Sequence, residues 1–163
     1  MKKNLIYAAA FALATAVLIP ADYASARTDN GSVTHIDGNV QFPPTRWSLV
    51  RHTFRLHVPQ NSKAVTKLLI NVPDTVTRSN DIKNIDVVDE NEQKINTNVF
   101  VNGRTILIDF SEPVAPNTKF HIDLNNVKRP TLGNGLVYGF SVKVVGSDAE
   151  IPIGIARFRR ILR

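Results

Sequence analysis

Residues 105–124 read TILIDFSEPVAPNTKFHIDL, with apolar side chains at every second position on both sides of a break at Pro116 and Asn117. Because successive side chains of a strand point to opposite faces, this alternation predicts two half-buried β-strands. Proline and asparagine favour turns, so the break predicts a tight connection between the strands. The alternating apolar residues are Ile106, Ile108 and Phe110 before the break and Phe120, Ile122 and Leu124 after it.

The same alternation recurs on both sides of this stretch, and residues 27–163 contain no convincing helical period. Counted from residue 42, the alternating segments number eight or nine, with turn signals at a spacing of roughly 8–12 residues. This pattern predicts an all-β fold, an Ig-like antiparallel β-sandwich, with a closed β-barrel as the alternative. The segments are 42–47, 49–58, 66–72, 85–88, 94–101, 105–110, 120–124, 136–145 and 153–161.

The inward phase of these segments contains the large side chains of the expected core. His52 falls in the same phase as Phe54, and a single histidine on such a face is usually a hydrogen-bonded core or rim residue. The segment 40–47 contains two prolines, so we expect an edge segment that lays its aromatic residues over one end of the core. The expected core phenylalanines are Phe54, Phe110, Phe120 and Phe140, and the expected edge residues are Phe42 and Trp47.

Two turn motifs stand between alternating segments. Asn102-Gly103 is a strong hairpin signal and predicts a type I′ turn, because both residues tolerate a positive φ. The acidic run Asp89-Glu90-Asn91-Glu92 has the D-x-N spacing of a calcium loop, but it lacks the glycine and the final acid of that loop. A solvated turn is the preferred interpretation.

Residues 1–26 have the three parts of a secretory signal peptide: basic Lys2 and Lys3, the apolar run 5–20, and small residues that predict cleavage after Ala26. An uncleaved membrane anchor is the alternative, but the run is shorter than the ~20 residues that span a bilayer. We expect export to the periplasm, cell envelope or extracellular space, with no transmembrane helix after processing. A flexible segment, 27–41, would precede a sandwich domain, 42–163.

Composition restricts what the protein does. The chain of 163 residues contains no cysteine, which excludes disulfides, thiol catalysis and lipid attachment to cysteine. Its stability therefore comes from packing. Loss of residues 1–26 lowers the net charge from +6 to +5, which attracts anionic surfaces only weakly. For an exported chain, nucleic acid is not an expected partner.

We predict no catalytic, cofactor-binding or metal-binding residues. The sequence lacks the serine-hydrolase elbow, the zinc-protease motif, the phosphate-binding loop and the dinucleotide-binding glycine run. His57 and His121 fall in the outward phase of their strands and, with Asp123, are candidates to lie near a metal. Their spacing matches no known metal-binding motif, so we expect no metal site there.

The C-terminus combines basic and apolar residues. The preferred interpretation is a final edge strand whose arginines discourage pairing with other sheets. The alternative is an anion-binding strip for acidic polysaccharide or lipid headgroups. Its candidate residues are Arg157, Arg159, Arg160 and Arg163.

Five short segments follow one another across nearly the whole chain after residue 26: Phe42-Pro43-Pro44, His57-Val58-Pro59, IDFSEPVAPNT at 108–118, Tyr138-Gly139-Phe140 and PIGIARF at 152–158. In this order they resemble a group of small exported cyanobacterial proteins catalogued as a domain of unknown function. Asn117 stands where that family more often has glycine. The resemblance implies export from a cyanobacterium and an all-β domain, and it implies no catalytic residues.

Three functions remain open from the sequence. The leading hypothesis is a non-enzymatic binding or structural module of the envelope or matrix, whose partner is an acidic cell-surface polymer or an envelope protein. The second is a weak anion binder that uses the C-terminal arginines. The third, an envelope hydrolase or metal-dependent enzyme, has no supporting constellation of residues.

The leader generates the first testable prediction. Expression of the full chain in a bacterial host should yield an exported product whose N-terminus is Arg27, as determined by N-terminal sequencing and intact mass. Replacement of the small residues Ala24 and Ala26 by leucine should block cleavage and leave the longer product in the membrane fraction. Export of an uncleaved wild-type chain would show that the segment is an anchor.

Overall fold

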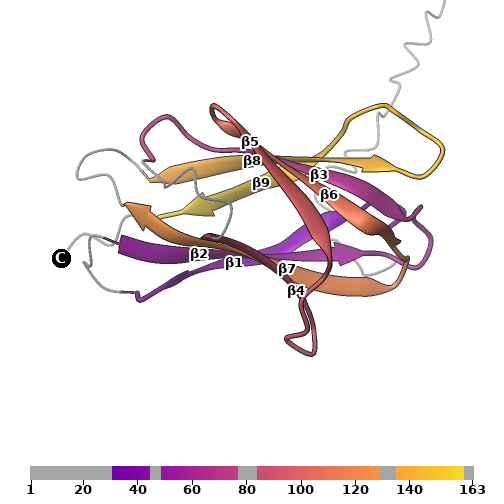
Figure 1. The fold of residues 1–163 in the computed structure, drawn as a ribbon, viewed down its shortest axis with the longest axis horizontal. Helices are drawn as coiled ribbons and strands as arrows, with labels where there is room; N and C mark the ends of the chain where they lie inside the picture. Colours follow the sequence, from indigo (N-terminus) through magenta and orange to yellow (C-terminus); the bar gives the residue numbers. More distant parts are fainter. Residues whose placement is uncertain (1–30, 45–48, 77–83, 129–134, 160–163) are drawn as a thin grey trace, which may run out of the picture.

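The computed structural model describes residues 31–44, 49–76, 84–128 and 135–159, which together form nine β-strands. The strands are β1 (His35–Phe42), β2 (Leu49–Val58), β3 (Val65–Asn71), β4 (Ile85–Asp89), β5 (Thr97–Asn102), β6 (Thr105–Val114), β7 (Thr118–Lys128), β8 (Leu136–Val144) and β9 (Ile151–Phe158). They build two antiparallel sheets, ordered β1-β2-β7-β4 and β5-β6-β3-β8-β9, which pack face to face (Figure 1). The predicted β-sandwich is confirmed, and the alternative of a closed barrel is wrong.

The two strands at the centre of the sequence pattern, β6 and β7, lie in different sheets. β6 pairs with β3 and β5, whereas β7 pairs with β2 and β4. The chain thus crosses from one sheet to the other at the turn, where Asn117 has a φ of 60°. The inward side chains of the two strands meet across the core, with the rings of Phe110 and Phe120 edge to face at 5.6 Å.

The core has an aromatic centre. The Phe54 ring packs edge to face against Tyr138 at 5.0 Å and against Phe140 at 4.9 Å. His52 is fully buried: Nδ1 is hydrogen-bonded to the Tyr138 hydroxyl at 2.8 Å, and the ring stacks on Phe158 at 4.0 Å. The prediction of a hydrogen-bonded core histidine is therefore confirmed. All four predicted core phenylalanines are buried as well.

The N-terminal edge differs from the prediction. β1 begins at His35, so residues 35–41, which we expected to be flexible, form an edge strand paired with β2. A register shift between Ile36 and Gly38 changes the phase of the alternation, which hid the strand in the sequence. Phe42 is 59% exposed and does not cover the core as expected, because it lies on the outer face. Trp47 and residues 1–30, including the leader, lie outside the described residues.

The predicted hairpin at Asn102-Gly103 is present as β5-β6, but the turn is of another type. Asn102 pairs with Thr105, so the two loop residues are Gly103 and Arg104. Gly103 has a φ of 55° and Arg104 is not among the residues with positive φ, which is typical of a type II′ turn with glycine at its first position. The shifted turn also places the Arg104 guanidinium where it donates to the carbonyls of Pro73, Asp74 and Val76.

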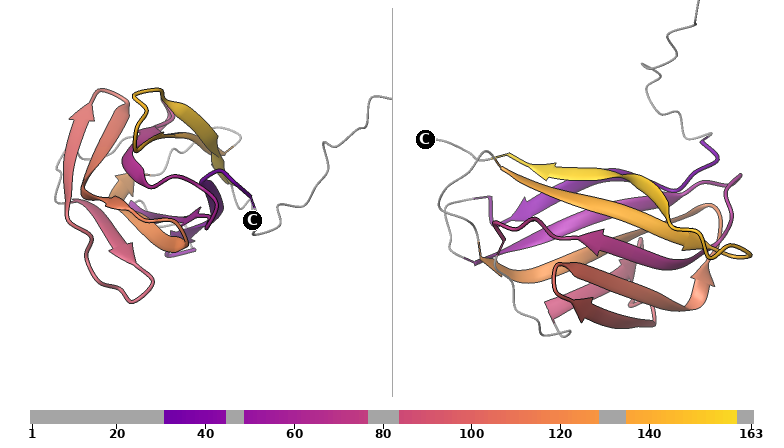
Figure 2. Two further views of the ribbon diagram at one scale, coloured as in Figure 1. Left: turned by 90° about the vertical axis from the view of Figure 1, so that its right-hand side faces the viewer. Right: turned by 90° about the horizontal axis from the view of Figure 1, so that it is seen from above.

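The two sheets approach each other along one side, where β1 lies beside β9 (Figure 2). The Asn39 side-chain amide of β1 donates to the Arg157 carbonyl of β9 at 3.1 Å. On the opposite side of the sandwich, the segment between β4 and β5 turns back and runs beside β4. There the Ile95 amide donates to the Val87 carbonyl at 2.9 Å. The described residues contain no helix with the length and hydropathy required to span a bilayer.

The core contact between β6 and β7 generates a stability prediction. Phe120 is 2% exposed, so Phe120→Ala should lower the free energy of unfolding by about 3–5 kcal/mol in a denaturant titration. Phe100→Ala is the matched control, because the Phe100 side chain is 55% exposed and its loss should cost only about 0.5 kcal/mol. A loss below about 1 kcal/mol for Phe120→Ala would contradict the assigned inward phase.

Candidate functional site

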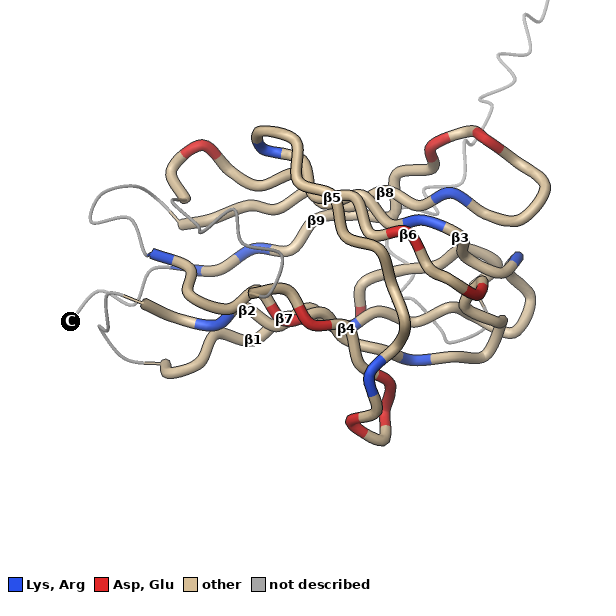
Figure 3. Tube along the Cα trace, viewed as in Figure 1, with Lys and Arg blue, Asp and Glu red and all other residues tan. Residues whose placement is uncertain are grey.

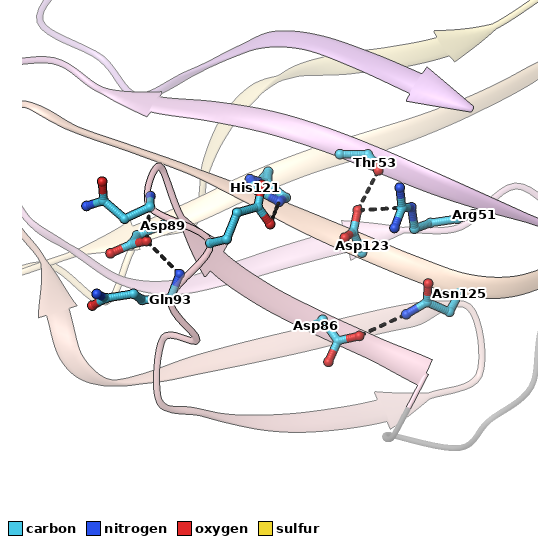
Figure 4. A network of polar contacts seen from close by, with 10 residues as sticks. Arg51, Thr53, Asp86, Asp89, Gln93, His121, Asp123 and Asn125 are labelled. Atoms are coloured by element: carbon cyan, nitrogen blue, oxygen red, sulfur yellow. Dashed lines mark hydrogen bonds and ion pairs between the residues drawn. The ribbon is translucent and has the colours of Figure 1, made fainter. Parts of the chain in front are cut away.

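A row of polar side chains crosses the outer face of the sheet β1-β2-β7-β4 (Figure 4). The strand register creates this row, because Thr53 of β2 lies opposite Asp123 of β7, which lies opposite Asp86 of β4. Directly opposite residues on neighbouring strands share one face of the sheet. Their neighbours along each strand point inward, so the same register that fills the core aligns these polar groups on the outside.

Each carboxylate of this row has its own donor. The Thr53 hydroxyl donates to Asp123, and the Arg51 guanidinium lies 3.8 Å from the same carboxylate. The Asn125 amide donates to Asp86 at 2.9 Å. Like charges directly opposite each other repel, so these donors offset the cost of placing Asp86 beside Asp123. The arrangement fixes a rigid pattern of charges and hydrogen-bonding groups on an open surface.

An exposed aromatic side chain borders the row. The Arg51 guanidinium lies 5.6 Å from the centre of the Phe42 ring, within the range of a cation–π contact. Val40, on the same edge strand, is also exposed. The surface therefore offers apolar, cationic and anionic groups side by side. We call this surface the polar face and define it by Phe42, Arg51, Thr53, Asp86, Asp123 and Asn125.

The acidic turn after β4 is a solvated turn, as predicted. The Asp89 carboxylate accepts hydrogen bonds from the amides of Asn91 at 2.8 Å and Gln93 at 2.9 Å. Glu92 has a φ of 60°, and its carboxylate reaches toward His121 at 3.7 Å. Figure 3 shows this turn as a group of acidic positions projecting from β4. The Asp89 carboxylate thus stabilises the turn itself.

The structure does not gather His57, His121 and Asp123 into one site. His121 faces Glu92, Asp123 faces Thr53 and Arg51, and His57 packs against His35 of β1. The register explains this separation, because His57 lies opposite Lys119, two residues before His121 on β7.

A different cluster forms where β1 begins. His35, Asp37 and His57 each place one potential metal-ligand atom within 4.8 Å of the others. His35 lies opposite His57, and their rings are 5.2 Å apart in an edge arrangement. Sequence reasoning misses the cluster because the polar residues 27–41 predict a flexible segment. The available signal was the i, i+2 spacing of His35 and Asp37, which places both on one face of a strand.

Of the four C-terminal arginines, Arg157 and Arg159 are exposed at and just after the end of β9, whereas Arg160 and Arg163 lie outside the described residues. β9 is an edge strand, as the preferred interpretation required. The anion-binding alternative stays a prediction.

A pocket of about 350 Å³ opens at one end of the sandwich, between the residues before β1 and the loops after β2 and β8. Ser32, Thr34, Lys63 and Val144 are among its lining residues. Its described lining contains no histidine and no carboxylate. The pocket is therefore separate from the histidine cluster and from the acidic residues of the polar face.

Fold and surface together define the class: an antiparallel β-sandwich with an apolar core and its polar groups on an outer face. Residues 38–156 match the family described as "Protein of unknown function (DUF2808)". The chain belongs to that family. A comparison of the sequence with curated proteins found no match.

Solved structures share the fold at low sequence identity. The RrgA Jo.In complex aligns with a TM-score of 0.51 and 7% identity, over 76% of this chain and 78% of that one. The N-terminal domain of a Streptococcus gordonii adhesin aligns with a TM-score of 0.51 and 8% identity, over 80% of this chain and 32% of that one. BslA, a bacterial hydrophobin, aligns with a TM-score of 0.48 and 15% identity, over 76% and 95%. The two alignments with a TM-score of 0.51 indicate a common fold and nothing further.

Proposed function

We propose that this protein is a non-enzymatic binding module, exported to the periplasm, cell envelope or extracellular matrix, and that the polar face is its contact surface. One observation carries the proposal: ionic, hydrogen-bonding and apolar groups are aligned on an open sheet face above a filled core. Groups held rigidly by strands are suited to recognition, because little side-chain entropy is lost on binding.

The arrangement of ionisable groups favours binding over catalysis. General acid–base chemistry needs such groups to converge on one reacting atom in a cavity. Here Asp123 and Asp86 are held by donors of their own sheet, and His121 faces the acidic turn. His35, Asp37 and His57 do converge, but they are not among the residues that line the described pocket. An envelope hydrolase would require these groups to face a common cavity.

The proposal also includes export of the protein and a cyanobacterial source organism. The signal-like residues 1–26 support secretion, and the resemblance seen in the sequence implies a cyanobacterial source. The partner we propose is an envelope protein or an acidic cell-surface polymer. A face that carries both Arg51 and Asp123 suits a partner with both charges, as most protein surfaces have.

Sedimentation with isolated cell-envelope material tests the proposal. The chain without its leader should co-sediment saturably, and the double variant Arg51→Ser/Asp123→Asn should bind about tenfold more weakly, since a charge-assisted pair is lost. The matched control is Lys67→Ser/Asp109→Asn, which removes a pair of 3.2 Å from the other sheet with the same change in charge. Equal binding by both variants, or no saturable binding by the wild type, would contradict the proposal.

The C-terminal arginines support a second candidate, an anion-binding strip, because Arg157 and Arg159 are both exposed. Substitution of all four arginines by serine should lower the salt concentration at which the protein elutes from a heparin column. The control variant loses the same four positive charges, because serine replaces Lys63, Lys67, Lys94 and Lys119. An unchanged elution salt, or an equal shift in the control, would show that the strip binds no anion specifically.

A further inference from the structure

We propose that His35, Asp37 and His57 form a binding site for a divalent transition metal ion. The three side chains come from the beginning of β1 and the end of β2, and their potential ligand atoms lie within 4.8 Å of one another. The register shift in β1 leaves Asp37 as an extra residue between Ile36 and Gly38. Such bulges redirect side chains, and this one leaves Asp37 in contact with His35.

The hydrogen bonds of His35 orient its ring as in a metal ligand. Nδ1 lies 3.2 Å from the Val33 carbonyl oxygen, and because a carbonyl only accepts, Nδ1 carries the hydrogen and donates it. In the neutral ring the lone pair is then on Nε2, which faces the Asp37 carboxylate at 2.9 Å. Histidine ligands of metals typically donate their second nitrogen to a carbonyl in this way.

A lone pair facing a carboxylate oxygen at this distance requires a positive charge between them. Either a proton or a metal ion supplies this positive charge, and the two differ in the number of residues that they contact. A proton needs only His35 and Asp37, whereas a metal ion also uses the imidazole of His57, whose ring lies 5.2 Å from that of His35. The convergence of all three donors therefore favours the metal ion.

The donor set selects the class of metal. Two imidazole nitrogens and one carboxylate oxygen suit zinc and its neighbours, whereas calcium and magnesium prefer sites made of oxygen. Two ligands of a tetrahedral zinc ion lie about 3.4 Å apart, since each bond is about 2.1 Å. Closing the cluster on an ion thus takes a shift of at most about 1.4 Å, shared between the partly exposed Asp37 side chain and the imidazole rings.

The surroundings suit a stable but accessible site. His35 and His57 are 7% and 5% exposed and sit on paired strands, so their backbone positions are fixed before the ion arrives. The Asp37 side chain is 32% exposed and leaves a route from solvent. Three protein ligands leave a fourth position for water or for a donor from a partner. A bound ion would also link the beginning of β1 to β2 and so stabilise this edge.

Isothermal titration calorimetry with ZnCl₂ tests the site on the chain without its leader, purified without a polyhistidine tag. We expect one zinc ion per chain with a micromolar or tighter dissociation constant, and a higher melting temperature with zinc. CaCl₂ and MgCl₂ should give neither effect. Asp37→Asn should weaken zinc binding by at least about tenfold. With Co²⁺ as a substitute for zinc, the wild type should show visible absorption bands, and Asp37→Asn should lose them. His57→Gln should act in the same way.

Two features keep the test decisive. His121→Gln is the matched control, because it removes a histidine that faces a carboxylate outside the cluster, and its zinc affinity should equal that of the wild type. Asp37→Asn alters a partly exposed side chain, so it decides the question even if His57→Gln fails to fold, with far-UV circular dichroism as the check. Absence of zinc binding, unchanged affinity in Asp37→Asn, or an equal loss in His121→Gln would overturn the proposal and leave a His35–Asp37 ion pair.

Discussion

The packing of apolar side chains between the two sheets holds this domain together. Phe110 and Phe120 meet across the core at the point where the chain passes from one sheet to the other. A fully buried side chain of this kind contributes roughly 1.5–3 kcal/mol, against a total stability of about 5–15 kcal/mol for a typical domain. Without cysteine the protein has no covalent alternative to this contact. Separation of the sheets would expose both rings together, which couples the two halves of the sandwich.

The core also determines what the outside presents. Phe54 lies opposite Ile122 inside the sandwich, and the same register places Thr53 opposite Asp123 on the outer face. A slip of one residue would turn the polar row into the core and the core into solvent. The positions of the polar face are therefore held by hydrophobic burial, while its own hydrogen bonds orient the side chains. Because the packed core holds its strands, the polar face is rigid although it lies on an open surface.

The histidines of β2 show how one strand serves two environments. His52 points inward, where the Tyr138 hydroxyl and the Phe158 ring accommodate it. His57 belongs to the outward phase, yet it is buried beside His35 at the edge of the sheet. The alternation in the sequence predicted the first environment correctly. It missed the second because the burial of His57 depends on β1, a strand whose own pattern is shifted by the register change at Ile36.

Alternating apolar residues were sufficient to predict β2–β9, the sandwich and the buried phenylalanines, because alternation is a local property with a period of two residues. They did not predict β1, whose alternation is interrupted by the register shift between Ile36 and Gly38. The partners of the strands were not predictable in this way. That β6 and β7 lie in opposite sheets, that Asn102 pairs with Thr105, and that Asp86 meets Asp123 all depend on contacts between distant residues. Those contacts are chosen by the packing that buries the most apolar surface, and this is a property of the whole folded chain rather than of any segment.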